Sequence, residues 1–382
     1  MKKKLIALSL VSLGSPLISG YAQAQSNVTL YGALDAGVRY TTNAGNHLHQ
    51  NADKSQLATN SGGLMTPHFG IKGAEDLGGG SSAIFNLESG FNIGNGMTNS
   101  SSDNKTFSQH SGETSLFGRQ AYVGLSDQQL GKITLGRQNT VGFDVAKNFD
   151  PSYFIGQSGI TYDLTGSIDG LQGNKRSNAT IKYTGTWDNL SLYGSLKPGN
   201  QIGSLIKGNA YALGLVYKTG MTTLGSSFSS ISHDRHPSEL ATEAIASGRT
   251  NIFNIGASHQ VGASTFRIGY AKSDIPLATM MNSSNGHIDI PSKSFHNVGL
   301  GIKHQASPKL NFTLATYAQF KNTANQHSAR GYKYLLGANY KVSNRTSLYA
   351  YADYSHNHLD HQLVGNRKSN RAGFMSGVTH SF

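Results

Sequence analysis

Apolar and polar residues alternate with a period of two along most of the chain, and this period indicates strands rather than helices. In one clear segment, Phe266, Ile268 and Tyr270 alternate with polar or small residues. The pattern predicts sixteen strands joined by alternately long and short connections: 27–40, 67–74, 83–91, 115–125, 132–138, 178–184, 190–196, 210–217, 222–230, 251–259, 264–272, 296–304, 310–320, 332–341, 347–354 and 372–382.

The last predicted strand, 372–382, alternates up to the final residue, Phe382. A strand at the edge of a sheet exposes unpaired backbone groups and invites aggregation. We therefore expect this strand to pair with the first one, 27–40, because closure removes both edges. The predicted fold class is all-β: a closed antiparallel 16-stranded transmembrane β-barrel with long loops at one end and short turns at the other.

The first residues have the pattern of a secretory signal peptide. Three lysines at positions 2–4 precede the apolar run 5–18, and Ala22 and Ala24 supply small residues for cleavage. The run is shorter than the about 20 residues that a membrane-spanning helix needs. We predict a signal peptide at 1–24, which is removed, and a single barrel domain at 25–382.

The composition favours a membrane barrel over a soluble domain. Charged residues make up 14% of the chain, against about 25% in soluble proteins. After the signal, no segment reaches 18 apolar residues, so strands rather than helices would cross the membrane. Regularly placed aromatic residues, 18 Tyr and 16 Phe, argue against disorder. Zero cysteines exclude disulfides. The formal charge of +12 favours a channel wall or an anionic surface over nucleic acid, because the chain is exported.

Several segments resemble the general trimeric porins of Gram-negative outer membranes: VTLYG at 28–32, FGIKGAEDLG at 69–78, AIFNLESGF at 83–91, LFGRQAYVGL at 116–125, LGRQ at 135–138 and SNRTSLY at 343–349. The resemblance implies a sixteen-stranded homotrimeric barrel in outer-membrane lipid, with short periplasmic turns and a third external loop, about 139–175, that folds inward to narrow the pore. It also implies that the outer-membrane assembly machinery recognises the terminal strand through Phe382. In one departure, His68 stands where the family usually carries Arg.

Selectivity in such a channel comes from its diameter and from rings of charge. Strand alternation, together with the cost of placing arginine in lipid, predicts one set of basic residues that line the pore: Arg39, His68, Lys72, Arg119, Arg137, Arg176 and Lys182. The predicted pore-lining acids are Asp35 on the wall and Asp144 and Asp150 on the long loop. The loop acids would face the basic wall and create a transverse field.

Two of these arginines conflict with strict alternation. Arg119 and Arg137 share a parity with apolar residues, yet an arginine that faces lipid near the midplane costs about 2–4 kcal/mol. We therefore expect Arg119 in the lumen, with Gln120, Tyr122 and Gly124 facing outward. For Arg137, a β-bulge near the long loop would reset the parity.

The predicted function is passive outer-membrane diffusion of small hydrophilic solutes and ions, with a mild anion preference and no cofactor. An alternative is an adhesin or phage receptor that displays eight external loops. An outer-membrane enzyme is disfavoured because no G-x-S-x-G or H-E-x-x-H motif occurs. The cluster His356, His358, Asp360 and His361 could bind a transition metal, but a solvated loop is the favoured interpretation, and no metal site is predicted.

Overall fold

The computed structural model describes residues 27–44, 54–98, 115–157, 175–199, 207–232, 244–246, 248–276, 278–282, 286–290, 292–324, 328–358 and 370–382. The proposed signal peptide and the second half of the segment 139–175 lie outside these residues. Within them, no helix is both long enough and apolar enough to cross a membrane.

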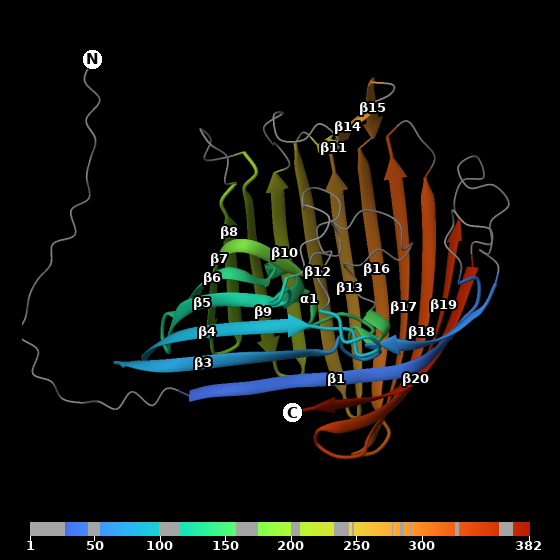
Figure 1. Cartoon of the computed structure of the whole chain (residues 1–382), viewed down its shortest axis with the longest axis horizontal. Helices are drawn as coiled ribbons and strands as arrows, with labels where there is room; N and C mark the ends of the chain where they lie inside the picture. Colours follow the sequence, from blue (N-terminus) through green and yellow to red (C-terminus); the bar gives the residue numbers. More distant parts are fainter. Residues whose placement is uncertain are drawn as a thin grey trace, which may run out of the picture.

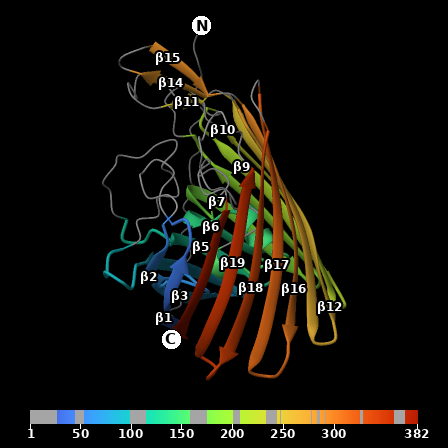
Figure 2. The ribbon, with the colours of Figure 1, turned by 90° about the vertical axis from the view of Figure 1, so that its right-hand side faces the viewer.

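The chain forms a closed antiparallel barrel (Figures 1 and 2). The helices are α1 (Val141–Ala146) and the short 3-10 helix η1 (Ile155–Gln157). The strands are β1 (Asn27–Thr41), β2 (Gln56–Ser61), β3 (His68–Gly78), β4 (Ser81–Gly90), β5 (Gln120–Asp127), β6 (Gly131–Asn139), β7 (Arg176–Trp187), β8 (Leu190–Lys197), β9 (Ala210–Thr219), β10 (Thr222–Ser232), β11 (Ala244–Ala246), β12 (Arg249–Val261), β13 (Ser264–Ile275), β14 (Ala278–Asn282), β15 (Gly286–Ile290), β16 (Lys293–Gln305), β17 (Leu310–Thr323), β18 (Ala329–Lys341), β19 (Thr346–His358) and β20 (Asn370–Ser381).

The first and last strands pair and close the sheet, as the sequence predicts. Nine residues of β1, from Ala33 to Thr41, lie opposite β20, and Ala36 faces Val378. The final residue joins this seam, because the backbone N–H of Phe382 donates to the carbonyl oxygen of Gly32 over 3.0 Å. Strands β11, β14 and β15 form a separate small sheet outside the barrel wall.

The second strand of the wall is broken in two. β1 pairs with β3 over Asn27–Ala33 and with β2 over Ala36–Thr41, so β2 and β3 continue one another along the same edge. Counting them as one strand, the 17-stranded sheet is a sixteen-stranded barrel. The sequence prediction of a loop at 41–66 was therefore wrong for Gln56–Ser61, which has no strong apolar alternation.

The chain leaves the wall between β2 and β3, and one buried carboxylate holds this excursion. Asp35, which is fully buried, accepts hydrogen bonds from the backbone N–H groups of three consecutive residues, Gly63, Leu64 and Met65, over 2.8–2.9 Å. The hydroxyl of Tyr349 donates to the same carboxylate over 2.6 Å. Asp35 thus joins β1, the excursion and β19 across the seam.

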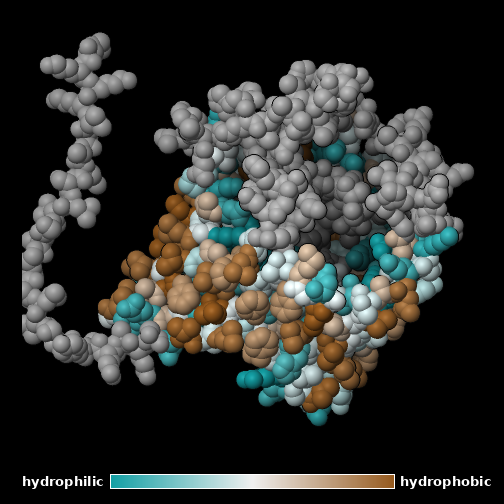
Figure 3. All heavy atoms as spheres, in the orientation of Figure 1, coloured by the Kyte–Doolittle hydropathy of each residue, from teal (hydrophilic) through white to brown (hydrophobic). Residues whose placement is uncertain are grey.

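The two faces of the wall differ in chemistry. On β9, Ala212 and Val216 point to one face and are 7% and 2% exposed, whereas Leu213 points to the other and is 67% exposed. The apolar face is the outer one, because the long loop packs on the opposite, concave face. Figure 3 shows apolar residues gathered over the outer face of the wall strands nearest the viewer. This distribution suits a barrel with hydrocarbon outside.

We expect Asp35→Asn to destabilise the folded barrel. The amide group offers one acceptor oxygen in place of two, so at least two buried donors lose their partner, at about 1–3 kcal/mol each. The measurement is the apparent melting temperature in detergent, followed by circular dichroism. Asp76→Asn is the control, because Asp76 accepts from the backbone N–H of Gly78 in an exposed turn. Equal melting temperatures for the two variants would contradict this account of Asp35.

Candidate channel constriction

Helix α1 lies on the inner face of the wall, directly after β6. Thr140 caps its first turn, since its hydroxyl accepts from the backbone N–H of Phe143. The apolar side chains Val141 and Val145 are fully buried and pack in one cluster with Ala212 and Val216 of β9. A helix of six residues is too short to be stable by itself, so this packing determines where it lies.

A row of glycines in the wall lets the loop lie flush against it. At Gly214 of β9, an added Cβ would come within 2.7 Å of Val141 and 2.8 Å of Val145. At Gly256 of β12 it would overlap the ring of Phe149, and at Gly301 of β16 it would overlap the carbonyl of Pro151, both closer than 3.0 Å. These strands follow one another around the barrel with β10 and β13 between them, so the loop follows the inner wall.

The far end of the described loop is fastened on the opposite side. Asp150 is fully buried and accepts from the hydroxyl of Tyr317 on β17 over 3.2 Å and from the backbone N–H of Ser152 over 3.1 Å. The backbone N–H of Gly156 then donates to the carbonyl of Gly63 in the excursion held by Asp35, over 2.8 Å. The loop thus runs along the inner wall from β6 to the seam.

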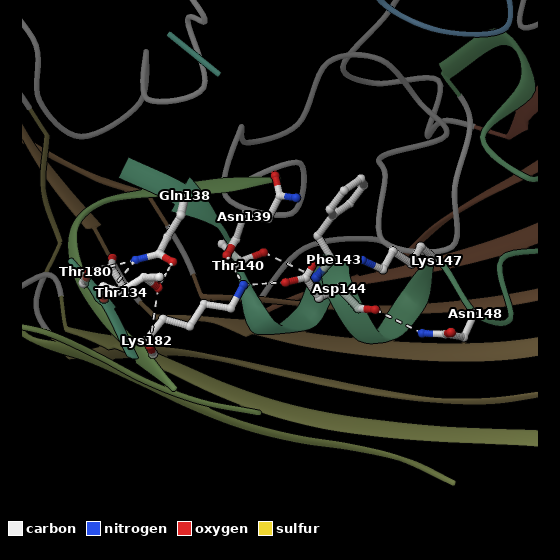
Figure 4. A network of polar contacts seen from close by, with 10 residues as sticks. All are labelled: Thr134, Gln138, Asn139, Thr140, Phe143, Asp144, Lys147, Asn148, Thr180 and Lys182. Atoms are coloured by element: carbon white, nitrogen blue, oxygen red, sulfur yellow. Dashed lines mark hydrogen bonds and ion pairs between the residues drawn. The ribbon is translucent and has the colours of Figure 1, made fainter. Parts of the chain in front are cut away.

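The loop acid Asp144 meets the basic wall in a buried ion-pair network (Figure 4). Its carboxylate pairs with Lys182 of β7 and, over 3.0 Å, with Lys147 one helical turn away. The ammonium group of Lys182 also donates to the carbonyl of Asn139 over 2.8 Å. Burial alone would raise the pKa of Asp144, but the two ammonium groups outweigh it and hold the pKa below its ordinary value.

A second charged cluster lies on the inner face of β1, β3, β4 and β5. Glu88 of β4 pairs with Arg119 and accepts from the hydroxyl of Tyr31 over 2.7 Å. His68, whose Nδ1 contacts the carbonyl of Thr66 over 2.8 Å, interacts electrostatically with Glu88 and Arg119. Arg119 lies just before β5 begins at Gln120, so strand alternation does not constrain its side chain.

The orientation expected for β5 was wrong. Tyr122 lies opposite Asn86, whose neighbour on the same face is Glu88, and Gln120 donates to Glu88 over 3.3 Å. Gln120, Tyr122 and Gly124 therefore face inward, while Val123 and Leu125 are 59% and 56% exposed on the outer face. Arg119 can therefore face the lumen while Val123 and Leu125 face outward, because Arg119 precedes the strand.

Arg137 does not reach the lumen. On β6 it alternates with Thr134 and Gln138, which bond to each other within the inner-face network, and it lies opposite Ala121. Its guanidinium donates to the carbonyl of Gly118 over 2.7 Å and to the side chain of Asn178. The expected bulge exists, but its extra residue lies on the partner strand β7, opposite the stretch of β6 between Gly136 and Gln138. It therefore leaves the parity of Arg137 unchanged.

The bulge in β7 instead affects the alternation that the sequence predicts for Arg176. Ala179 adopts a φ of 48° and interrupts the alternation that the sequence predicts from Arg176 to Lys182. Arg176 is nevertheless 9% exposed and interacts electrostatically with His68, whose side chain lies on the inner face of β3. Arg176 is thus near the Glu88 cluster, although strand alternation does not explain this position because the bulge interrupts it.

Arg39 and Lys72 lie on the inner face, where alternation predicts them. Arg39 donates to Asp353 of β19 over 2.7 Å, and its guanidinium carbon lies 5.6 Å from the centre of the Tyr351 ring. The ammonium of Lys72 lies 5.2 Å from the centre of the Tyr31 ring. These cation–π contacts orient the charged groups without neutralising them.

Sequence reasoning missed a basic pair on the far wall. Arg267 of β13 and Lys303 of β16 flank the ring of Tyr153 in the loop, at 3.5 Å and 4.7 Å from its centre. Arg267 also donates to the carbonyl of Asp150 over 3.0 Å. The signal was present, because both cations occupy polar positions of strands whose alternate residues are apolar. Only the position of the loop in the structure, with Tyr153 between them, distinguishes Arg267 and Lys303 from other cations at polar strand positions.

The histidine cluster 356–361, for which the sequence favours a solvated loop over a metal site, lies partly outside the described residues, because these exclude Asp360 and His361. In the described part of the chain, no three His, Cys, Asp or Glu side chains gather as they would around a metal ion.

The Asp144 network makes stability depend on pH. Because the pKa of Asp144 is lowered on folding, its contribution is complete above the unfolded pKa of about 3.9 and is lost as the pH falls through the lower, folded pKa. We expect the apparent melting temperature of the wild type to fall more steeply between pH 5 and pH 3 than that of Asp144→Asn. At neutral pH this variant should itself be about 3–5 kcal/mol less stable, since the buried ammonium of Lys182 is left without a counter-ion.

Asp274→Asn is the control for this titration. Asp274 forms an exposed ion pair with Lys272, and such pairs contribute little to stability. Its pH profile should follow that of the wild type. Identical slopes for the wild type and Asp144→Asn would show that the loop acid does not hold the loop.

Comparison with known proteins places this geometry in a family. The sequence profile of the Gram-negative porin family matches residues 7–361. An outer membrane porin of Bordetella pertussis is 27% identical over an alignment that covers 100% of both chains. Outer membrane porin protein 32 of Delftia acidovorans is 41% identical over 88 residues, which are 23% of this chain and 22% of that one.

Solved structures have the same fold. The anion-selective porin from Comamonas acidovorans aligns with a TM-score of 0.69 at 20% identity and covers 94% of this chain and 100% of its own. In-vitro folded OmpT of Vibrio cholerae aligns with a TM-score of 0.64 at 11% identity and covers 94% and 100%. Because the family profile spans most of the sequence and the chain closes into the same barrel, this protein belongs to the Gram-negative porins, a family of outer-membrane channels rather than enzymes.

Proposed function

We propose that this porin is a passive diffusion pore for small hydrophilic solutes and ions, that the segment 139–157 narrows it, and that it prefers anions mildly. One observation supports the preference. Among the described residues, the lumenal carboxylates of Asp35, Glu88, Asp144, Asp150 and Asp353 bond to protein partners, whereas Lys72 and Lys303 have no carboxylate within ion-pair distance. The wall, rather than a field between wall and loop, then provides the selectivity.

The loop acids contribute little to the field that a passing ion meets. The charge of Asp144 is balanced by Lys182 and Lys147. Asp150 is buried against Tyr317 and the backbone of its own turn. Both carboxylates fasten the loop. In place of the transverse field expected from the sequence, we therefore propose a positive wall that faces a nearly neutral segment 139–157.

The unpaired lysines are positioned to meet solutes. An ammonium on an aromatic face is held by about 0.5–1 kcal/mol at exposed sites and keeps its N–H donors available to water or to an anion. Lys72 rests in this way on Tyr31, and Lys303 rests on Tyr153 of the loop. The anion selectivity named for the Comamonas acidovorans porin agrees with this assignment.

We also propose that three copies associate through the outer face of β1–β6. Arg137 lies on that face, where contact with lipid would cost up to about 2–4 kcal/mol, depending on its depth in the bilayer, and a neighbouring copy would remove this cost. A trimer form is named for OmpT of Vibrio cholerae. The terminal strand β20, which ends beside Phe382, remains the proposed signal for the assembly machinery.

Selectivity should depend on the two lysines. In a planar bilayer under a KCl gradient, we expect the wild type to favour chloride over potassium, and Lys72→Gln/Lys303→Gln to lower the permeability ratio about twofold or more. Lys272→Gln is the matched control, since Lys272 is paired with Asp274 in an exposed ion pair and, by alternation with Arg267, lies on the outer face. A wild type that favours potassium, or a double variant with an unchanged ratio, would refute the anion preference.

The position of the loop should set the conductance. In Gly256→Ala the added Cβ overlaps the ring of Phe149, so the loop must move away from the wall and into the channel. We expect a lower single-channel conductance and a loss of about 1–3 kcal/mol of stability through overpacking. The control is Gly194→Ala, where the nearest atom, Cδ2 of Leu213, would lie at an ordinary 3.8 Å. Equal conductance in the two variants would show that the loop does not narrow the pore.

A further inference from the structure

The outer face of the barrel repeats one arrangement at its short-turn end. His259 lies opposite Thr222 on the neighbouring strand, and Nδ1 of its ring is 2.8 Å from the threonine hydroxyl. His304 lies in the same way opposite Ser264, and His380 opposite Thr346, with both distances 2.9 Å. Three separate strand pairs thus build the same contact.

The backbone around the three contacts is also equivalent. The residue after each histidine donates its N–H to the carbonyl of the residue that precedes the hydroxyl residue. These bonds join Gln260 to Met221, Gln305 to Ala263 and Ser381 to Arg345, over 3.0, 2.9 and 2.8 Å. Each histidine therefore occupies the same structural position, in a cross-strand residue pair, or rung, close to a short turn.

Three further strand pairs have this rung but carry other residues. In one, Asp127 lies opposite Ser81, whose hydroxyl donates to its carboxylate over 2.7 Å, and Gln128 makes the backbone bond to Gly80 over 3.2 Å. Tyr217 lies opposite Leu190 and Tyr340 opposite Leu310, and the residues after them, Lys218 and Lys341, make the same backbone bond over 2.8 Å. Where the ring is tyrosine the partner is leucine, and where the ring is histidine the partner carries a hydroxyl. The hydroxyl thus accompanies a polar partner at this position, histidine in three rungs and Asp127 in a fourth, and leucine accompanies tyrosine.

The rings lie where the hydrocarbon layer ends. All three histidines are exposed, and the residues two positions before them on the same outer face are the apolar Ala257, Ile302 and Val378. On their other side the rings neighbour Phe266, Phe312 and Leu34 across the adjoining strands. Apolar side chains therefore lie beside and before each ring, and the polar turns follow it.

The hydroxyl contact leaves one ring nitrogen for a partner outside the protein. When the hydroxyl donates to Nδ1, the neutral ring carries its hydrogen on Nε2, and that N–H is a donor directed away from the contact. Protonation adds a positive charge and keeps this donor. The turn residues Lys309 and Arg345 lie close in sequence to two of the rungs and add fixed positive charge. Such a surface fits the phosphate oxygens of a lipid headgroup.

We propose that His259, His304 and His380 form a headgroup-binding row, which holds anionic phospholipids in the leaflet on the short-turn side of the outer membrane. The row is independent of the ion selectivity of the channel. It needs only the outer face, which the barrel and its membrane location provide.

The test is native mass spectrometry of the protein released from mixed micelles that contain equal amounts of dioleoyl phosphatidylglycerol and dioleoyl phosphatidylcholine. We expect the wild type to retain phosphatidylglycerol in preference to phosphatidylcholine. The triple variant His259→Tyr/His304→Tyr/His380→Tyr, which copies the residues found at the two tyrosine rungs, should retain at least threefold less phosphatidylglycerol. Retention of phosphatidylcholine should be unchanged.

Two further variants make the outcome decisive. His296→Tyr alters an outer-face histidine at the other end of β16, where Nδ1 contacts the hydroxyl of Tyr270, and should behave as the wild type. Thr222→Ala/Ser264→Ala/Thr346→Ala keeps the rings but frees Nδ1, and should show an intermediate loss even if the triple tyrosine variant does not fold. Equal retention of both lipids by the wild type, full retention by the triple variant, or an equal loss in His296→Tyr would overturn the proposal.

Discussion

Hydrocarbon offers no hydrogen-bond partner, so each backbone N–H and C=O group that faces it must be paired within the protein. This constraint determines the role of β1, whose two edges are both occupied. One edge pairs with β20, the other with β3 and then with β2. The break between β2 and β3 interrupts the ladder, and the side chain of Asp35 supplies the acceptors that the excursion needs. The wall can therefore be interrupted at the point where a buried carboxylate replaces the missing partners.

The same wall also receives the loop on its inner face. Gly214, Gly256 and Gly301 leave the inner surface without side chains where Val141, Phe149 and Pro151 approach it. Charge then fixes the loop at its beginning, through Asp144 and Lys182, and hydrogen bonds fix it further along, through Asp150 and Tyr317. Asp144 and Asp150, the acids of the described part of the loop, are used in this attachment. The anion preference that we propose would in this sense be a consequence of how the loop is fastened.

Alternation was sufficient to predict the closed barrel, because one face of each strand must be apolar, and that requirement is local in sequence. It failed where a contact distant in sequence decides. Segment 56–61 is polar, and it is a strand only because the edge of β1 is available beside it. Arg119 escapes alternation by preceding its strand, and Arg137 obeys alternation because the bulge lies on β7. The pairing of Asp150 with a tyrosine 167 residues later has no local signal, so the role of this acid could not be read from the loop alone.

The seam has a consequence for the order of events during folding. Ala36 faces Val378, so this rung joins residues from the two ends of the chain, and the loss of chain entropy on forming it is larger than for any hairpin. The hydrogen bond from Tyr349 to Asp35 spans the same junction, and the bond from Gly156 to Gly63 joins the loop to the excursion that Asp35 holds. Sealing the cylinder and seating the loop should therefore occur together, in one late and cooperative step. A chain that has not yet delivered its last strand would have neither a complete wall nor a fastened constriction.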